Sequence, residues 1–133
     1  GFGEPTLAWE TLKQVAAYVK RQGKPVRVNT NGLGNLANGR DITPEAKGLV
    51  DTFSISLNAS TPEAYQEICH SQYGQQALLE FAKLASRYVP HVVFTVVDSI
   101  GQEEIEKSRK LAQNCGAKLR VRAYVENWEE SAD

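Results

Sequence analysis

Short polar segments follow the predicted strands of this 133-residue chain, and they carry the side chains best suited to binding a ligand. In chain order these residues are Gly3 and Glu4, Asn29, Thr30 and Asn31, Ser56 and Asn58, and Asp98 and Ser99. Ligands of parallel α/β sheets gather beyond the carboxyl ends of the strands, so we expect these segments to surround one pocket. Their neutral polar groups suit an amino acid or a nucleoside. A polyphosphate is disfavoured, because the sequence has no glycine-rich loop with a lysine.

The two cysteines, Cys69 and Cys115, are interpreted as small buried side chains, because each stands beside an apolar helical stripe. A nucleophilic cysteine needs a histidine close to it in space, and the sequence leaves open whether His70 or His91 takes that place. The cysteines and histidines also lack the paired spacing of a zinc site, which needs about four ligands.

Each polar segment also has a purely structural interpretation. Glu4 could begin the following helix, where acidic residues are favoured, although ligand contact is our preferred interpretation. Asn29 and Asn31 could form a plain turn, and the two interpretations of this pair stand equal. Ser56 could be a small inward residue, and Asn58 could cap the next helix.

Two arginines on the last predicted strand, Arg120 and Arg122, alternate with apolar residues. They point either toward a substrate anion inside a barrel or over the outer face of the sheet. The outer face is the preferred prediction.

The elements that must position these residues alternate between helix and strand. Apolar residues at helical spacing predict helices over 12–19, 78–85 and 105–115, and Thr43-Pro44 and Thr61-Pro62 predict two further helix starts. Strands are expected at 26–28, 53–57, 91–97 and 118–125, with a loop over 32–39. The apolar run at 91–97 predicts a strand buried on both faces. This order predicts one α/β domain of parallel βαβ units with right-handed crossovers.

Composition excludes several classes of protein. A formal net charge of −1 argues against a protein that neutralises a nucleic-acid backbone. No apolar run approaches the roughly 20 residues that cross a bilayer, and no leader segment is visible. We therefore expect a soluble, cytoplasmic protein with no nucleic-acid or membrane partner.

Three strand-end motifs resemble the radical S-adenosylmethionine (SAM) superfamily: Gly3-Glu4-Pro5, Thr30-Asn31-Gly32 and Ser56-Leu57-Asn58. The branch of the glycyl-radical activating enzymes is the most similar. The resemblance implies the later part of a partial (β/α)6 TIM-like barrel over residues 1–125, from the end of its second strand through its sixth, and an acidic tail at 126–133. It also implies an enzyme that reduces SAM at a [4Fe-4S] cluster, which releases methionine and a 5′-deoxyadenosyl radical that abstracts a hydrogen atom.

The resemblance assigns six residues to SAM: Gly3, Glu4, Asn29, Asn31, Ser56 and Asn58. The first pair matches the loop that binds the amino group of the methionine moiety, with the carboxylate of Glu4 as an acceptor or a positioning group. The second pair matches positions near the methionine carboxylate, and the third pair matches positions at the ribose. Phe2 departs from the family, because it stands where the first glycine of the usual motif would be.

The cluster-binding loop of the family, with its three closely spaced cysteines, has no counterpart among the two distant cysteines of this chain. We therefore expect a fragment that begins after that loop and is inactive alone, with an enzyme as its intact parent. The substrate is open, and a protein is one class to consider. A truncated barrel exposes an edge strand, which predicts self-association. The alternative function is a stand-alone α/β module that binds a small molecule without redox chemistry.

Overall fold

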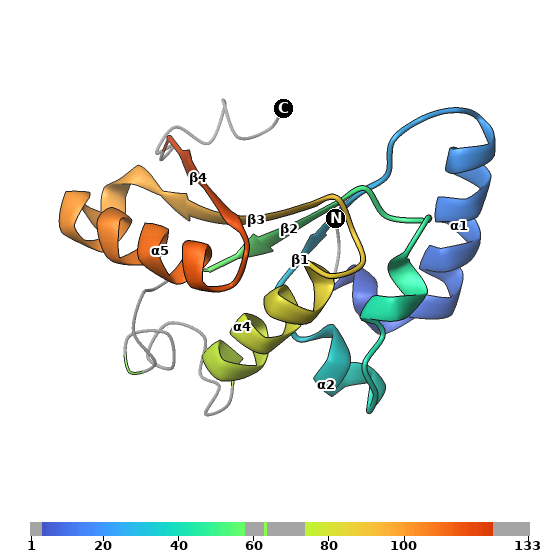
Figure 1. Cartoon of the computed structure of the whole chain (residues 1–133), viewed down its shortest axis with the longest axis horizontal. Coiled ribbons are helices and arrows are strands. Elements are labelled where there is room, and N and C mark those ends of the chain that lie inside the picture. Colours follow the sequence, from blue (N-terminus) through green and yellow to red (C-terminus); the bar gives the residue numbers. More distant parts are fainter. Residues whose placement is uncertain (1–3, 58–62, 64–73, 124–133) are drawn as a thin grey trace.

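The computed structural model describes residues 4–57, 63 and 74–123, and within them helices alternate with four parallel strands (Figure 1). The first half contains η1 (Pro5–Ala8), α1 (Trp9–Arg21), β1 (Arg27–Thr30), α2 (Gly34–Asn38), η2 (Thr43–Ala46) and β2 (Thr52–Ser56). The second half contains α4 (Gly74–Ala85), β3 (His91–Val97), η3 (Asp98–Ile100), α5 (Gln102–Asn114) and β4 (Lys118–Arg122). The predicted α/β fold of parallel βα units is confirmed.

The strands lie in the sheet in their chain order, β1-β2-β3-β4, and each neighbouring pair is parallel. Asn29 lies opposite Ser54, and Thr95 lies between Ser56 on one side and Arg120 on the other. Side chains alternate between the two faces of a strand, so this register decides which residues share a face.

One face of the sheet carries the core, because α1, α4 and α5 all lie on that side of it (Figure 1). The fully buried side chains there include Phe53, Ile55, Leu78, Phe81 and Phe94. Phe53 of β2 and Phe81 of α4 pack edge to face, with ring centroids 5.2 Å apart and an interplanar angle of 76°. No described helix covers the other face.

The prediction that β3 is buried on both faces is wrong. Burial alternates along the strand, with Val92, Phe94 and Val96 buried and Val93, Thr95 and Val97 only partly so. A continuous apolar run indicates two covered faces only where a second layer is present, and β3 has a helical layer on one side alone among the described residues.

Other predicted boundaries also differ from the structure. The first strand is Arg27–Thr30, and the residue before it, Val26, donates its N–H to the Asp51 carboxylate at 2.7 Å. The predicted loop 32–39 contains α2, and the Asn38 amide donates to the Thr6 carbonyl at 2.9 Å, which ties this helix to η1. The helix start predicted at Thr43-Pro44 is present, as the short 3-10 helix η2. The last strand is described only to Arg122, and Thr61-Pro62 lies outside the described residues.

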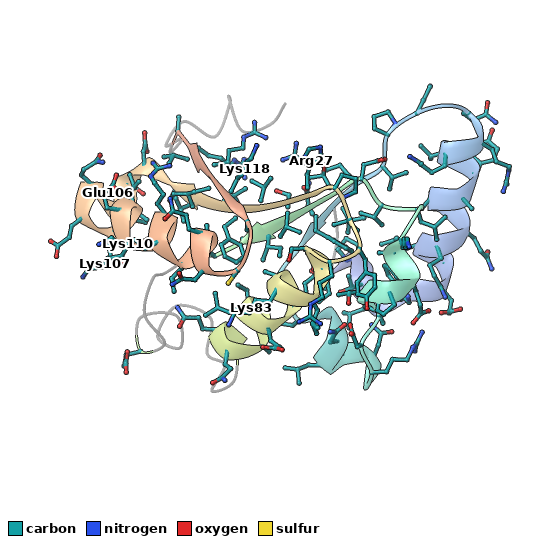
Figure 2. All side chains as sticks on the ribbon, in the orientation of Figure 1. Arg27, Lys83, Glu106, Lys107, Lys110 and Lys118 are labelled. Atoms are coloured by element: carbon teal, nitrogen blue, oxygen red, sulfur yellow. The ribbon has the colours of Figure 1, made fainter. Side chains whose placement is uncertain are left out.

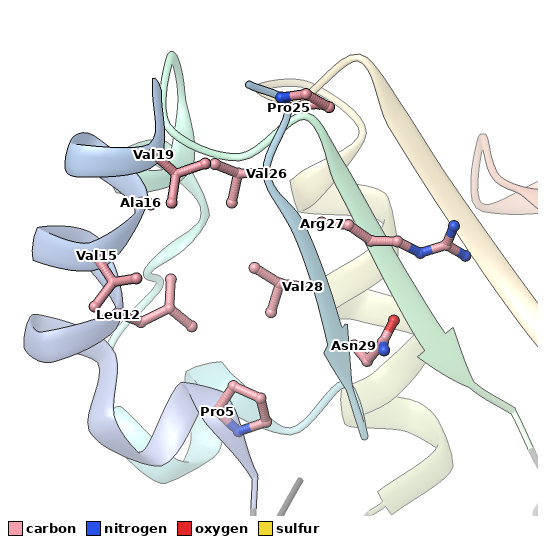
Figure 3. A pocket seen from close by; sticks show the side chains of 10 residues that line it. All are labelled: Pro5, Leu12, Val15, Ala16, Val19, Pro25, Val26, Arg27, Val28 and Asn29. Carbon is pink, nitrogen blue, oxygen red and sulfur yellow. The ribbon is translucent and has the colours of Figure 1, made fainter. Parts of the chain in front are cut away.

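The free edge of β1 borders an apolar groove of about 560 Å³ against α1 (Figure 3). Leu12, Val15 and Val19 line it from the helix, and Val26 and Val28 line it from the strand side. An exposed edge of the sheet is thus present, while self-association through it stays a prediction. Among the described helices, none is long and apolar enough to cross a membrane.

Candidate functional site

The open face of the sheet holds a polar cavity of about 300 Å³ to which all four strands contribute. Its lining residues are Arg27, Asn29, Ser54, Ser56, Thr95, Arg120 and Arg122. Side chains alternate between the two faces of a strand. Each of these residues stands an odd number of positions from the core residues of its strand, so its side chain lies on the face opposite the core. Figure 3 shows this on β1, where Arg27 and Asn29 point away from α1 while Val26 and Val28 point toward it.

Two of the predicted site residues, Asn29 and Ser56, come together in this open-face cavity. Both side chains are exposed, and Ser56 lies opposite Thr95, which lines the same cavity. Amide and hydroxyl groups both donate and accept hydrogen bonds, so the pair can bind hydroxyls or a carboxylate. The interpretation of Ser56 as a small residue on the inner face is compatible with this place.

Glu4 does not line the open-face cavity, because its carboxylate is bound within the chain. Oε2 accepts hydrogen bonds from the Thr6 N–H at 2.9 Å, from the Thr6 hydroxyl and from the Thr30 hydroxyl at 2.7 Å. Oε1 accepts from the Asn31 N–H at 2.7 Å. Glu4 therefore caps η1, as the structural interpretation expected, and also ties η1 to the carboxyl end of β1. This arrangement suits a positioning group.

Asn31 is separated from Asn29 by the end of the strand. Its side-chain oxygen accepts from the Leu33 N–H at 2.9 Å, which is the plain-turn geometry. Together with Glu4 it lines a second, more apolar hollow of about 280 Å³, whose other walls are residues of η1, α2 and the loop before α2. The predicted residues are thus divided between two cavities, and Gly3 and Asn58 lie outside the described residues.

The prediction that Arg120 and Arg122 cover the outer face is wrong. The pairing of Thr95 with Arg120 places both arginines on the open face, where they line the polar cavity together with Arg27. Sequence reasoning missed Arg27 altogether. The alternation of the sequence could have predicted this position. Val28 and Leu119 are apolar and face the core, so the arginines next to them in each strand lie on the opposite face.

The three arginines are exposed, and their lack of carboxylate partners distinguishes them from the paired charges elsewhere on the described surface. Arg27 Nη2 donates to the hydroxyl of buried Ser54 at 3.4 Å, so its guanidinium lies over β2. Within the described part of the chain, the ion pairs involve other residues, and no carboxylate pairs with Arg27, Arg120 or Arg122.

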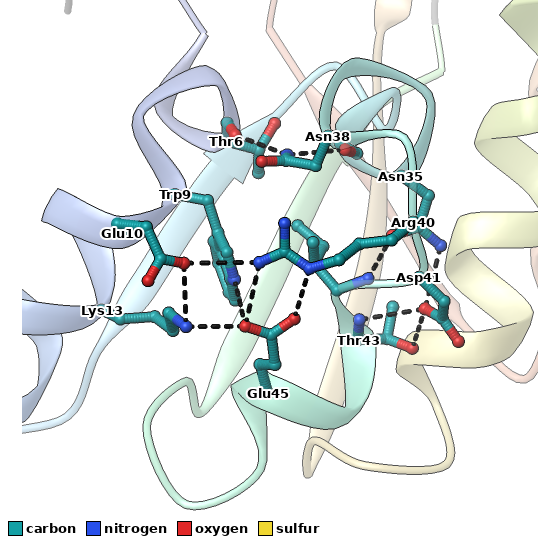
Figure 4. A network of polar contacts seen from close by, with 12 residues as sticks. Thr6, Trp9, Glu10, Lys13, Asn35, Asn38, Arg40, Asp41, Thr43 and Glu45 are labelled. Carbon is teal, nitrogen blue, oxygen red and sulfur yellow. Dashed lines mark hydrogen bonds and ion pairs between the residues drawn. The ribbon is translucent and has the colours of Figure 1, made fainter.

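A separate polar network joins α1 to η2 on the outside of the fold (Figure 4). Glu45 accepts from Arg40 Nε at 3.0 Å, from Lys13 Nζ at 2.6 Å and from Trp9 Nε1 at 3.3 Å. The Arg40 and Lys13 hydrogen bonds lower the pKa of Glu45 to about 2. A shifted pKa often marks a functional site, but these residues line neither the polar cavity nor the hollow beside Glu4, so the network is structural.

The described residues do not fit an iron–sulfur cluster. They contain no group of three or more histidine, cysteine, aspartate or glutamate side chains that could hold a metal ion. Cys115 is buried at the end of α5, as predicted, and this burial raises the pKa of its thiol. Cys69 lies outside the described residues.

Comparisons with known proteins agree with this fold. MJ0804, an uncharacterised protein of Methanocaldococcus jannaschii, is 29% identical over 131 residues, which cover 95% of this chain and 44% of that protein. The structure of TYW1 with a lysine-pyruvate adduct bound superposes with a TM-score of 0.70 at 17% identity, over 93% of this chain and 40% of that one. A domain of the pyruvate-formate lyase-activating enzyme of Bacteroides vulgatus superposes with a TM-score of 0.55 at 15% identity, over 91% of this chain and 95% of that one.

These structural likenesses concern the fold alone. The chain spans less than half the length of MJ0804 and of TYW1. The sequence supplies the family, because the model of the radical SAM superfamily matches residues 1–112. This chain belongs to the radical SAM superfamily.

Proposed function

We propose that this chain is the SAM-binding portion of a radical SAM enzyme and that SAM lies on the open face of the sheet beside Asn29 and Ser56. One observation carries the proposal: polar side chains from all four strands line a single cavity on the face that no described helix covers. Concave sites with a few convergent polar groups are where proteins bind small molecules.

Two side chains of the cavity, Asn29 and Ser56, suit SAM. Asn29 and Ser56 offer neutral donors and acceptors for the ribose hydroxyls and for the methionine carboxylate. Glu4 acts as a positioning residue, since it holds the Asn31 N–H and the Thr30 hydroxyl at the end of β1. Gly3 and Asn58 complete the proposed set, with Gly3 at the amino group and Asn58 at the ribose.

The radical chemistry belongs to a longer parent protein in this proposal. There a [4Fe-4S] cluster with SAM would supply a 5′-deoxyadenosyl radical that abstracts a hydrogen atom from the substrate. This chain contributes the walls of the SAM site and no cluster ligands. We further propose the glycyl-radical activating-enzyme-like branch, which the motif resemblance and the fold of the Bacteroides vulgatus domain support.

A second candidate is a stand-alone α/β module that binds a small polar molecule without redox chemistry. The same polar cavity, lined by Asn29, Ser56 and Thr95, would serve that function as well. The two functions differ in the parent protein, where only the radical SAM enzyme needs three clustered cysteines and iron.

Titration calorimetry of the full chain with SAM tests the proposed site. Asn29→Ala and Ser56→Ala should each weaken SAM binding about three- to tenfold, because each removes one or two hydrogen bonds. Asn114→Ala, at the exposed end of α5, is the matched control and should leave the affinity unchanged. The proposed site would be contradicted if the folded chain binds no SAM. It would also be contradicted if the two site variants and the control lower the affinity for SAM equally.

The longer protein then separates the two functions. Purified without oxygen, it should contain about four iron and four sulfide ions per chain and should convert SAM to 5′-deoxyadenosine on reduction. A folded protein without iron and without SAM cleavage would leave the binding module as the function.

A further inference from the structure

We propose that Arg27, Arg120 and Arg122 form a site for an anionic group of the substrate, either a carboxylate or a phosphate. The proposal rests on the proposed function, because it names the substrate class of the same cavity. It uses residues that the resemblance did not assign to SAM.

The three arginines converge from opposite edges of the sheet. β1 and β4 are the two edge strands, and a flat sheet would separate them by roughly 14 Å, since neighbouring strands lie about 4.8 Å apart. Even so, Arg27 of β1 and the two arginines of β4 line one cavity of about 300 Å³. Arginine side chains are long, so those of both outer strands reach this common space.

The charge in this space is uncompensated by the described residues. No ion pair joins any of the three guanidiniums to a described carboxylate, although ion pairs are present elsewhere among the described residues. Lys118 adds to the charge, because it shares the face of Arg120 and lies on the same side of the sheet as Arg27 (Figure 2). Like charges in a shared cavity repel one another, and a bound anion removes that repulsion.

The neighbouring groups complete an anion site. Ser54 and Thr95 line the same cavity and provide hydroxyl donors. Guanidinium groups bind carboxylates and phosphates through paired hydrogen bonds, which lysine ammonium groups do not form.

SAM itself is a poor match for the arginines. It carries a sulfonium and an ammonium against one carboxylate, so its net charge is positive at neutral pH, and three guanidiniums repel it overall. An anionic substrate beside SAM would offset both sets of positive charge. The arginines are therefore assigned to the substrate.

Two-dimensional NMR of the full chain, titrated separately with inorganic phosphate and with acetate at constant ionic strength, tests this assignment. Arg120→Gln and Arg122→Gln should each weaken the binding of at least one anion by about fivefold or more, and the double variant should weaken it further. Lys110→Gln is the control of equal charge change, because Lys110 is exposed on α5 on the helical side of the sheet (Figure 2), and it should change the affinity less than twofold. Stronger binding of phosphate would indicate a phosphate ester, and stronger binding of acetate a carboxylate.

SAM affinity measured on the same variants separates this proposal from the proposed function. An unchanged SAM affinity with weakened anion binding supports a substrate site. If SAM affinity falls together with anion affinity, the arginines hold the cofactor's carboxylate, and the substrate assignment is overturned. Anion binding that is equal in the arginine and control variants also overturns it. Arginine-dependent anion binding in a chain that binds no SAM supports the anion site and refutes the SAM site.

Discussion

Replacement of Gly32 by alanine should destabilise the chain strongly, because this glycine both adopts a left-handed backbone and lies against the core. Its φ is +80°, and a Cβ there would lie 2.8 Å from Leu78 Cγ and 3.0 Å from Ile55 Cγ2. Leu78 and Ile55 are both fully buried, so neither can move aside freely. Gly32 ends the turn after β1, and its N–H donates to the Thr30 hydroxyl at 3.1 Å.

The magnitude has a backbone part and a packing part. A left-handed backbone costs an alanine about 1–2 kcal/mol relative to its preferred conformations. Overpacking of a filled core costs about 1–3 kcal/mol more. We therefore expect Gly32→Ala to lower the free energy of unfolding by about 2–5 kcal/mol, a large part of the stability of a small domain.

Gly48→Ala is the matched control for the backbone part. Its φ is +78°, nearly that of Gly32, but nothing lies within 4 Å of the added Cβ. Urea unfolding followed by circular dichroism should therefore show a loss of only about 1–2 kcal/mol for this variant. Equal losses in the two variants would refute the close approach of the turn to Leu78 and Ile55. Gly32→Ala should also weaken SAM binding, since it displaces the turn that Glu4 and Asn31 share, and Gly48→Ala should not.

Two further predictions concern carboxylates. Glu4→Gln should lower the free energy of unfolding by about 1–3 kcal/mol, because the amide turns one acceptor into a donor among N–H and O–H donors. Glu106→Gln, which removes an exposed surface ion pair, should change it by less than about 1 kcal/mol. Similar urea midpoints for the two variants would contradict the role of Glu4. Glu45, whose pKa falls from an ordinary 4.5 to about 2, contributes stability that is complete above about pH 4.5 and is lost as the pH falls toward 2. The melting temperature of Glu45→Gln should therefore lie below that of the wild type at pH 7 and approach it near pH 2. A difference in melting temperature that stays constant from pH 7 to pH 2 would show that the network does not lower the pKa of Glu45.

Local pattern was enough to predict the architecture of this chain. Apolar spacing and Gly or Pro boundaries depend on neighbouring residues, so the strand at His91–Val97 and the alternation of helix and strand were predicted correctly. The rule that ligands gather at strand ends also brought Asn29 and Ser56 into one cavity. The family could be inferred from three short motifs for the same reason, since each motif is contiguous in the chain.

Tertiary structure alone decided which residues face the cavity and which are used internally. Glu4 binds Thr30 and Asn31, which lie 26 and 27 residues away, so only the packing of η1 against β1 reveals that its carboxylate is occupied. The side of the sheet that Arg27, Arg120 and Arg122 occupy depends on which face the helices cover. That choice is made by the burial of apolar surface across the whole sheet, a non-local free energy that no short stretch of sequence contains.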